Sequence, residues 1–226
     1  MSLLQVSWPL DVLQRLFGPI GPGKLVLIGS RPGTGKGVMA LQMASHNAAR
    51  MPVLYLDTRP NRALMNAYDD WCAQLRAEGV SAHAFEQLTL DEVERMVGEH
   101  VRAYGPGLVV INTLQEMTHD CDPSEEDEHP TLSYISMRLK TLAITHRIAI
   151  VCASQLEAEA DREPGRRPKL YHLRGSGALE GDADQVYFLW RDGSLKIAQE
   201  KHRTGRPQST AIDLDYDLSA RVLKAR

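Results

Sequence analysis

The sequence predicts a single α/β domain built on a mainly parallel sheet with helices on both sides. Four almost uninterrupted apolar runs predict strands covered on both faces, at residues 25–29, 53–57, 108–112 and 148–154. Helical spacing of apolar residues predicts helices at 35–50 and 131–147, and strands that alternate with helices form parallel sheets. A chain of 226 residues is too short for two ordinary domains, so residues 1–226 are expected to fold as one unit.

The helices are predicted from their periodicity and their ends. The helix at 89–105 begins with a capping box, in which the side chains of Thr89 and Glu92 accept each other's backbone N–H groups, and it ends at Gly105. The helix at 35–50 has one apolar face, formed by Val38, Leu41, Ala44 and Ala48. The helix at 131–147 has another, formed by Leu132, Ile135, Leu139 and Leu142.

The last third of the chain predicts antiparallel strands. Two strand-like runs, at 185–190 and 195–200, are separated by four residues that include Asp192 and Gly193, a pair typical of tight hairpins. We expect this hairpin to extend the sheet. Two segments are expected to be loops, an acidic one at 119–129 and a flexible one at 157–169 that turns basic toward its end. Both follow the carboxyl end of a predicted strand, where open parallel sheets bind ligands.

Composition narrows the classes of function. The net charge is −3 and the pI is near 6.2, so nucleic acid would have to bind a local patch. The three cysteines, Cys72, Cys121 and Cys152, have no metal-binding spacing and are interpreted as thiols. The three tryptophans are interpreted as packing residues. No stretch has membrane-spanning length, so the sequence predicts a soluble cytoplasmic protein without a membrane partner.

The segment GSRPGTGKG at residues 29–37 predicts a phosphate-binding loop. It follows a strand and precedes a helix, so backbone N–H groups and the helix N-terminus would converge on phosphate oxygens. Lys36 would reach the terminal phosphates of ATP or another nucleoside triphosphate. The general pattern ends in Gly-Lys-Ser/Thr and begins with Gly, whereas Ser30 and Gly37 occupy these two positions, which leaves an ordinary glycine turn as the alternative. The predicted cofactor-binding residues of the loop are Arg31, Pro32, Gly33, Thr34, Gly35, Lys36 and Gly37.

Five further segments follow the loop along the chain, in this order: VLYLD, GLVVINTLQEM, ASQL, LRGSGALEGDADQVYFLWRD and EKHRTG. With these segments and the loop, the chain resembles the C-terminal RecA-like motor domain of the replicative hexameric DNA helicases of DnaB type. The resemblance covers almost the whole chain from residue 10 onward. Its most specific part runs from ASQL to LWRD, because no generic nucleotide-binding fold requires those residues. The resemblance implies a RecA-like P-loop fold with C-terminal antiparallel strands.

The resemblance also implies roles at the catalytic centre. Asp57 stands where the family has a glutamate that activates the attacking water, and Gln155 matches a glutamine that senses the terminal phosphate. Lys201 and Arg203 match a pair that is delivered across a ring to the nucleotide of a neighbouring subunit. Without a neighbour, both side chains are equally explained as exposed charges at a strand end.

Single-stranded DNA is the partner that the resemblance implies. The residues Arg174, Gly175, Ser176 and Gly177 match the loop that lines the central channel of the ring and contacts DNA phosphates, although Gly175 replaces a glutamate. Arg166 and Arg167 belong to a basic loop that would follow a nucleic-acid backbone. The alternative interpretation is that this run of basic residues is an ordinary solvent-exposed loop.

Two departures from the family fall on the magnesium ligands. Gly37 replaces the Ser or Thr that binds Mg²⁺, and Asn112 replaces the aspartate that ends the third strand of the family pattern and helps to hold that ion. The resemblance therefore implies an ATP site, including Asn112, in which Mg²⁺ binding is weakened. Our hypothesis is that nucleotide binding is kept while hydrolysis is slow or absent. The alternative is a compensating carboxylate, supplied by Asp57 or Glu116.

Three functions are weighed. The first is a helicase-like domain that binds nucleotide and single-stranded DNA with weak or no hydrolysis, in DNA replication or as a regulator or partner of a helicase. The second is an active DNA-stimulated ATPase and helicase that works as a homo-oligomeric ring. The third is a recombination or clock-type RecA-like ATPase, which the ASQL and LRGSG segments disfavour. Without nucleotide and DNA, the chain is expected to be monomeric or weakly associating.

Overall fold

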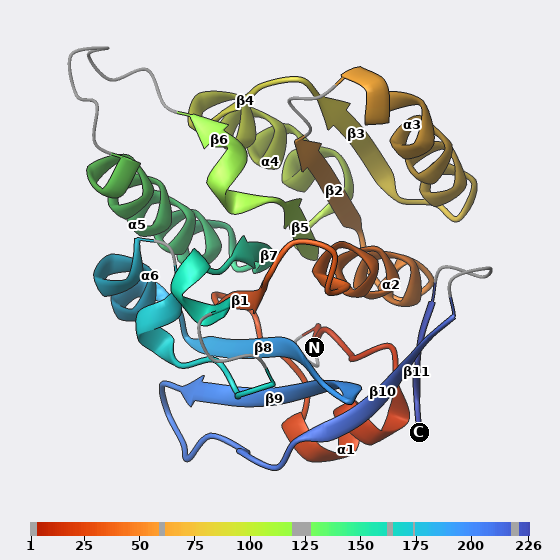
Figure 1. The fold of residues 1–226 in the computed structure, drawn as a ribbon. Helices are drawn as coiled ribbons and strands as arrows, with labels where there is room; N and C mark the ends of the chain where they lie inside the picture. Colours follow the sequence, from red (N-terminus) through yellow and green to blue (C-terminus); the bar gives the residue numbers. More distant parts are fainter. Residues whose placement is uncertain (1–3, 59–61, 119–127, 162–164, 174, 218–221) are drawn as a thin grey trace.

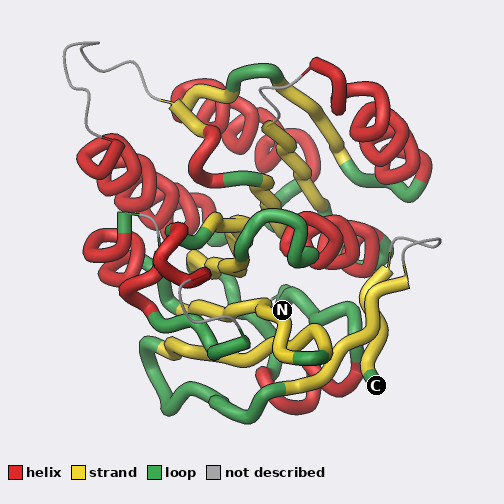
Figure 2. The backbone as a smooth tube through the Cα atoms, viewed as in Figure 1, coloured by secondary structure: helices red, strands yellow, loops and turns green. Residues whose placement is uncertain are grey.

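The computed structural model has the α/β architecture that the sequence predicts, and it describes residues 4–58, 62–118, 128–161, 165–173, 175–217 and 222–226. Strands form the middle of the molecule and helices lie on either side (Figure 2). The main sheet has nine strands, which in spatial order are β11 (Val222–Ala225), β10 (Ile212–Asp217), β9 (Ser194–His202), β8 (Gln185–Asp192), β1 (Leu25–Ser30), β7 (Ala149–Gln155), β5 (Leu108–Asn112), β2 (Val53–Thr58) and β3 (Ser81–Phe85).

The pairing of the strands changes from parallel to antiparallel once across this sheet, at β8. The six strands from β8 to β3 are parallel, and β9, β10 and β11 continue the sheet with antiparallel pairing. The expected hairpin is confirmed as β8–β9, where Asp192 pairs with Ser194 and Gly193 has φ +68° in the left-handed region. The parallel part therefore brings the carboxyl ends of all six strands, among them β1, β2, β5 and β7, to one edge of the sheet.

Helices cover both faces of the sheet (Figure 1). One apolar core joins the sheet to α1 (Asp11–Phe17), α2 (Lys36–Ala48) and α3 (Arg62–Ala77). The other joins it to α4 (Leu90–Tyr104), α5 (Glu128–His146) and α6 (Ser176–Asp182). Alternate residues of each central strand enter opposite cores, as when Val26 and Ile28 face α2 while Leu25 and Leu27 face the other side. Buried strands of this kind explain the uninterrupted apolar runs in the sequence.

The capping box is present as expected. The backbone N–H of Glu92 donates to the Thr89 hydroxyl over 3.2 Å, and the Thr89 N–H donates to the Glu92 carboxylate over 3.0 Å. A short pair of strands, β4 (Leu88–Thr89) and β6 (Met117–Thr118), lies beside this helix start. The acidic segment lies mostly outside the described residues, but its last two residues, Glu128 and His129, belong to α5 instead of a loop.

The segment at 157–169 that turns basic toward its end contains a short 3₁₀ turn at Ala158–Asp161. A second 3₁₀ turn, at Leu170–His172, directly follows the segment. Residues 162–164 between them lie outside the described part. Within the described residues, no helix is both long enough and apolar enough to cross a membrane. Cys72 and Cys152 are buried thiols, while Cys121 lies outside the described residues.

Candidate nucleotide-binding site

The predicted phosphate loop lies between the carboxyl end of β1 and the first turn of α2. Gly33 and Gly35 have φ +72° and +112°, a region that residues with a Cβ atom rarely adopt, so both positions require glycine. Gly35 is the N-cap of the 13-residue helix α2, and Lys36 is its first residue. The loop therefore leads into a helix N-terminus, where the first backbone N–H groups have no partner within the helix and the helix dipole favours anions.

A cavity of about 170 Å³ opens at this loop. It brings together five residues that the sequence assigns to the nucleotide site, namely Gly33, Gly35, Lys36, Gly37 and Asn112. Two aromatic residues that sequence analysis does not assign to it, Trp71 and Tyr216, complete the wall. The full lining is Gly33, Gly35, Lys36, Gly37, Val38, Trp71, Asn112 and Tyr216.

Beside this cavity, Asp57 and Asn112 form a buried polar cluster with Tyr55. The parallel pairing of β2 with β5 places Asp57 opposite Asn112. The Asn112 side-chain amide donates to the Asp57 carboxylate over 3.0 Å and to the Tyr55 hydroxyl over 3.2 Å. The Tyr55 hydroxyl donates to the same carboxylate oxygen over 2.7 Å. A neutral amide donor at position 112 thus stabilises the buried carboxylate, whereas a second carboxylate there would repel it.

These contacts test whether the residues fit the magnesium ligands that the resemblance implies. The amide nitrogen of Asn112 is directed at Asp57 and Tyr55, and its oxygen accepts the Thr113 hydroxyl over 3.2 Å. Gly37 has no side chain. Neither position supplies the carboxylate or hydroxyl that Mg²⁺ prefers. Among the described residues there is also no cluster of three or more His, Cys, Asp or Glu side chains suited to a metal. The two positions therefore do not fit that ligand pair.

The carboxyl end of β7 lies next to the loop and is held by two side chains. Ser30 and Gln155 are register partners in β1 and β7. The Gln155 backbone N–H donates to the Gln115 side-chain oxygen over 2.7 Å, and Arg31 donates to the Leu156 carbonyl oxygen over 2.6 Å. Gln155, the predicted phosphate sensor, is therefore positioned at the sheet edge that carries the loop, with its side chain half-buried. Within the loop, Thr34 is buried and Pro32 is exposed.

Lys201 and Arg203 lie elsewhere, against the C-terminal end of α6. The Lys201 ammonium donates to the Glu180 carbonyl oxygen, and the Arg203 guanidinium donates to the Gly181 carbonyl oxygen. The last carbonyl groups of a helix carry partial negative charge, so cations are favoured there. Burial, together with the neighbouring Arg203 charge, lowers the pKa of Lys201 below its ordinary value. In the single chain, this pair contacts its own α6 and does not line the phosphate-loop cavity.

The residues expected to contact DNA form two groups, one at 174–177 and the other at Arg166 and Arg167. Arg174 lies outside the described residues. Gly175 is the N-cap of α6 with φ +79°, and a Cβ atom there would lie 3.1 Å from Leu132 Cδ1, so a glycine fits where the family has a glutamate. Ser176 begins α6 and Gly177 is exposed.

Arg166 and Arg167, which are adjacent in sequence, have different environments. Arg166 is exposed. The Arg167 guanidinium pairs with the Glu200 carboxylate over 2.7 Å, donates to the Gln199 carbonyl oxygen over 2.8 Å, and lies 5.9 Å from the centre of the Trp190 ring. Arg167 therefore anchors the basic loop to the sheet.

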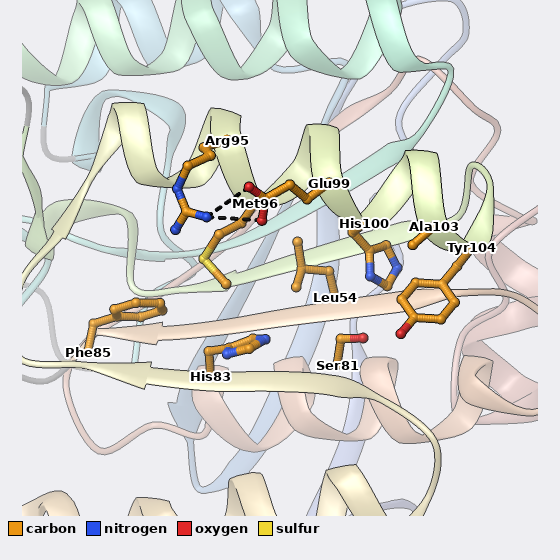
Figure 3. A pocket seen from close by; sticks show the side chains of 10 residues that line it. All are labelled: Leu54, Ser81, His83, Phe85, Arg95, Met96, Glu99, His100, Ala103 and Tyr104. Carbon is orange, nitrogen blue, oxygen red and sulfur yellow. Dashed lines mark hydrogen bonds and ion pairs between the residues drawn. The ribbon is translucent and has the colours of Figure 1, made fainter.

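A second and larger cavity, of about 450 Å³, lies between the edge strand β3 and helix α4 (Figure 3). His83 and His100 extend into it from the strand and from the helix, and Arg95 pairs with Glu99 at its upper wall (Figure 3). Burial lowers the pKa of both histidines, aided by the charge of Arg76 for His83 and by that of His83 for His100. His100 is only 7% exposed. No residue of the predicted nucleotide site lines this cavity.

Taken together, the order of the parallel strands, the glycine-rich loop after β1 and the C-terminal antiparallel strands define a RecA-like α/β domain. A family model of the DnaB-like helicase C-terminal domain matches residues 61–219. The chain belongs to this family. The matched range begins after the phosphate loop, so the loop is assigned from its own geometry.

Curated relatives include replicative DNA helicases DnaB from several bacteria. The chain is 28% identical to that of Treponema pallidum over 247 residues, which cover 96% of this chain and 55% of the relative. It is 25% identical to that of Mycoplasma pneumoniae over 261 residues, which cover 94% of this chain and 54% of the relative. The chain thus spans about half the length of the curated relatives it matches.

Solved structures show the same fold. The structure described as a DnaB-like replicative helicase and its interactions with primase matches with a TM-score of 0.81 at 19% identity, over 100% of this chain and 63% of that one. Another solved structure, described as an ATPase domain, matches with a TM-score of 0.81 at 20% identity, over 98% of this chain and 91% of that one. A KaiC-like protein from Pyrococcus horikoshii matches with a TM-score of 0.69 at 17% identity, over 99% of both chains.

Proposed function

We propose that this chain is a DnaB-helicase-like domain that binds a nucleoside triphosphate and single-stranded DNA, and in which ATP hydrolysis is weak or absent. The support for nucleotide binding is the loop cavity, where Lys36 and the N-terminus of α2 provide positive charge and N–H donors. Replication is the process named for its relatives, which are replicative DNA helicases.

The observation that carries the proposal is the set of hydrogen bonds made by the Asn112 side chain. Its amide nitrogen donates to Asp57 and Tyr55, so a neutral donor occupies a position from which the family directs a carboxylate toward a metal. Phosphoryl transfer depends on charge neutralisation around the transferred group. Removing one preorganised contact of this kind costs about a hundredfold or more in rate, and here two positions, Gly37 and Asn112, lack it.

Asp57 is affected by the same contacts. As the residue at the position of the family's water-activating carboxylate, it would have to accept a proton from water at the nucleotide. In this chain Asp57 is buried, and its carboxylate accepts hydrogen bonds from Tyr55 and Asn112. These bonds hold the carboxylate in the sheet, which supports slow hydrolysis.

The second candidate is an active DNA-stimulated ATPase in a ring. Four residues of the family pattern favour it: Lys36, Gln155, Lys201 and Arg203 are present. In such a ring, Lys201 and Arg203 would leave the C-terminus of α6 and reach the nucleotide of the next subunit. Asp57, or Glu116 which is half-buried after β5, would supply the carboxylate that compensates for Asn112. The similarity to a KaiC-like protein supports the fold alone.

Calorimetric titration with ATP tests the binding part of the proposal. The native chain is expected to bind ATP, and Lys36→Ala is expected to weaken binding about tenfold or more, because a charge-assisted contact to phosphate contributes about 1.5–3 kcal/mol. Lys224→Ala is the matched control, since Lys224 is an exposed lysine on β11 that pairs with Asp217. Equal ATP affinity of native chain and Lys36→Ala would contradict the loop assignment.

A further inference from the structure

The groove between the edge strand β3 and helix α4 is a cavity of about 450 Å³ that is separate from the phosphate loop. Pockets that hold small organic molecules have volumes of about 300–1,000 Å³. Alternate residues of β3, namely Ser81, His83 and Phe85, form one wall, and residues from three successive turns of α4 form the other (Figure 3). The groove therefore has the size of a ligand site, and its walls are two regular elements of the fold.

His100 is the one buried residue among the polar residues that line this groove, at 7% exposure. Its ring extends from α4 into the groove (Figure 3) and lies 5.0 Å from the Tyr104 ring, centre to centre. Among the described residues, no group forms a hydrogen bond with its Nε2 atom. Native proteins pair nearly all their buried polar atoms, because an unpaired one destabilises the fold. A ligand that forms a hydrogen bond with His100 would remove this cost.

The polar side chains of the groove favour a ligand with negative charge. Four of them carry hydrogen-bond donors: Ser81, His83, His100 and Tyr104. The one carboxylate in the lining, Glu99, already accepts hydrogen bonds from Arg95, over 3.0 Å to each oxygen. Burial lowers the pKa of both histidines, followed by the charge of Arg76 for His83 and by that of His83 for His100. An anion in the groove would accept the donors and stabilise the charged form of the imidazoles.

The rest of the lining is apolar, so it suits a ligand with an apolar body. Leu54 of β2 is buried, and Phe85 and Met96 are partly buried against the same apolar core. The ring of Phe85 offers a flat face to an aromatic ligand, and the unbranched side chain of Met96 adapts to the shape of its neighbour. An acid group and a ring would therefore each find a matching part of the groove.

We propose that this groove binds a small aromatic carboxylate, whose acid group is held by His100 and His83 and whose ring lies against Phe85. The inference does not rest on the proposed nucleotide function, because the two cavities share no lining residue. A neutral molecule of the same shape would give the imidazoles no countercharge, and a carboxylate without a ring would leave the apolar wall in water. Both parts of the ligand are needed for tight binding.

Calorimetry with three probes tests the class of ligand. Benzoate, benzyl alcohol and acetate are each titrated into the native chain. Benzoate is expected to bind, and the other two are expected to bind at least about tenfold more weakly, because each lacks either the charge or the ring. Equal affinity for benzyl alcohol or acetate, or no binding of benzoate, would overturn the proposal. Excess ATP should not displace benzoate, and displacement would place benzoate at the phosphate loop and would also overturn it.

The variant His100→Phe tests the buried imidazole, because it keeps an aromatic ring and removes Nε2. It is expected to weaken benzoate binding about tenfold or more, through the loss of a hydrogen bond to a charged group. Its Tm should equal or exceed that of the native chain, since an unpaired buried atom is removed. His146→Phe, at the end of α5 and outside the groove lining, is the matched control and should bind benzoate like the native chain.

A folded His100→Phe that binds benzoate like the native chain would contradict the proposal. His83→Phe is a second variant that leaves the core unchanged, because His83 is exposed. It is expected to weaken benzoate binding severalfold by removing the second imidazole. Native affinity in His83→Phe would equally contradict the assignment.

The pH dependence of binding gives a readout that a purely structural role of His100 would not alter. The charged and titratable groups around His100 are His83 of β3, with Arg76 of α3 beside it, and Arg95, Glu99 and Tyr104 of α4. Burial lowers the pKa of His100 in the free chain, and a bound carboxylate would raise it. Benzoate affinity should therefore increase severalfold as the pH falls from 8 to 6, whereas benzyl alcohol affinity should not.

NMR titration of the His100 imidazole protons measures this pKa directly, with and without benzoate. The pKa is expected to rise when benzoate is bound. A pKa of His100 that saturating benzoate leaves unchanged would overturn the proposal.

Discussion

Asp184 is a buried carboxylate that connects three parts of the fold. It accepts the Leu25 backbone N–H over 2.9 Å and the Lys140 ammonium over 2.6 Å, and it lies 3.4 Å from both Lys24 and Arg203. Burial alone would raise its pKa, but the hydrogen bonds from Lys140 and Leu25 and the charges of Lys140 and Lys24 lower the pKa below its ordinary value. One side chain therefore ties β1, α5 and the end of α6 together.

We predict that Asp184→Asn lowers the free energy of unfolding by about 3 kcal/mol at pH 7, because it removes one partner of a buried ion pair. Since the folded pKa lies below the unfolded one, this contribution is complete above the unfolded pKa of about 3.9 and is lost as the pH falls through the folded pKa. Urea unfolding of both proteins at pH 7 and pH 3 measures the difference. A difference of the same size at both pH values would contradict this account.

Some residues of the candidate site can be identified from the sequence alone, and others cannot. The motif and the parallel strand ends place Lys36, Gly37 and Asn112 in one site, and all three line one cavity. The sequence does not reveal Trp71 and Tyr216 as site residues, because their place depends on how α3 and the C-terminal hairpin pack, which no local pattern encodes. The contacts of Asp57 with Tyr55 and Asn112 depend on the register of β2 with β5.

At the level of elements, the central strands are predictable and the outer strands are not. The strands β1, β2, β5 and β7 are buried on both faces, so their apolar runs identify them. The edge strand β3 reads SAHAF and β10 reads IDLDYD, and their mixed polarity follows from partial exposure. The capping box predicts helix α4, whereas α5 starts at Glu128, within the acidic run expected to be a loop.

The DNA assignment depends on the segment of residues 174–177. We predict that Arg174→Ala weakens binding of a fluorescent oligo(dT) measured by anisotropy, and lowers the slope of log affinity against log salt by about 1, because one phosphate contact is lost. The matched control is Arg95→Ala, an exposed arginine on α4 that pairs with Glu99. If both variants bind DNA like the native chain, the residue at position 174 does not contact DNA.

The whole molecule combines the RecA-like fold with two departures from the family pattern at the proposed nucleotide site. Lys36, Gln155, Lys201 and Arg203 match that pattern, while Gly37 has no side chain and the Asn112 amide nitrogen donates to Asp57. Lys201 and Arg203 contact α6 of the same chain, so a ring would require them to exchange these contacts for a neighbour's nucleotide. The chain spans about half the length of its curated relatives.

Steady-state ATP turnover tests the central claim most directly. The rate is measured with magnesium, with and without single-stranded DNA, and Lys36→Ala serves as the control for contaminating ATPases. We predict no turnover above that control in either condition, while calorimetry still detects ATP binding to the native chain. DNA-stimulated turnover that disappears in Lys36→Ala would contradict the claim and would show that other groups replace the ligands missing at Gly37 and Asn112.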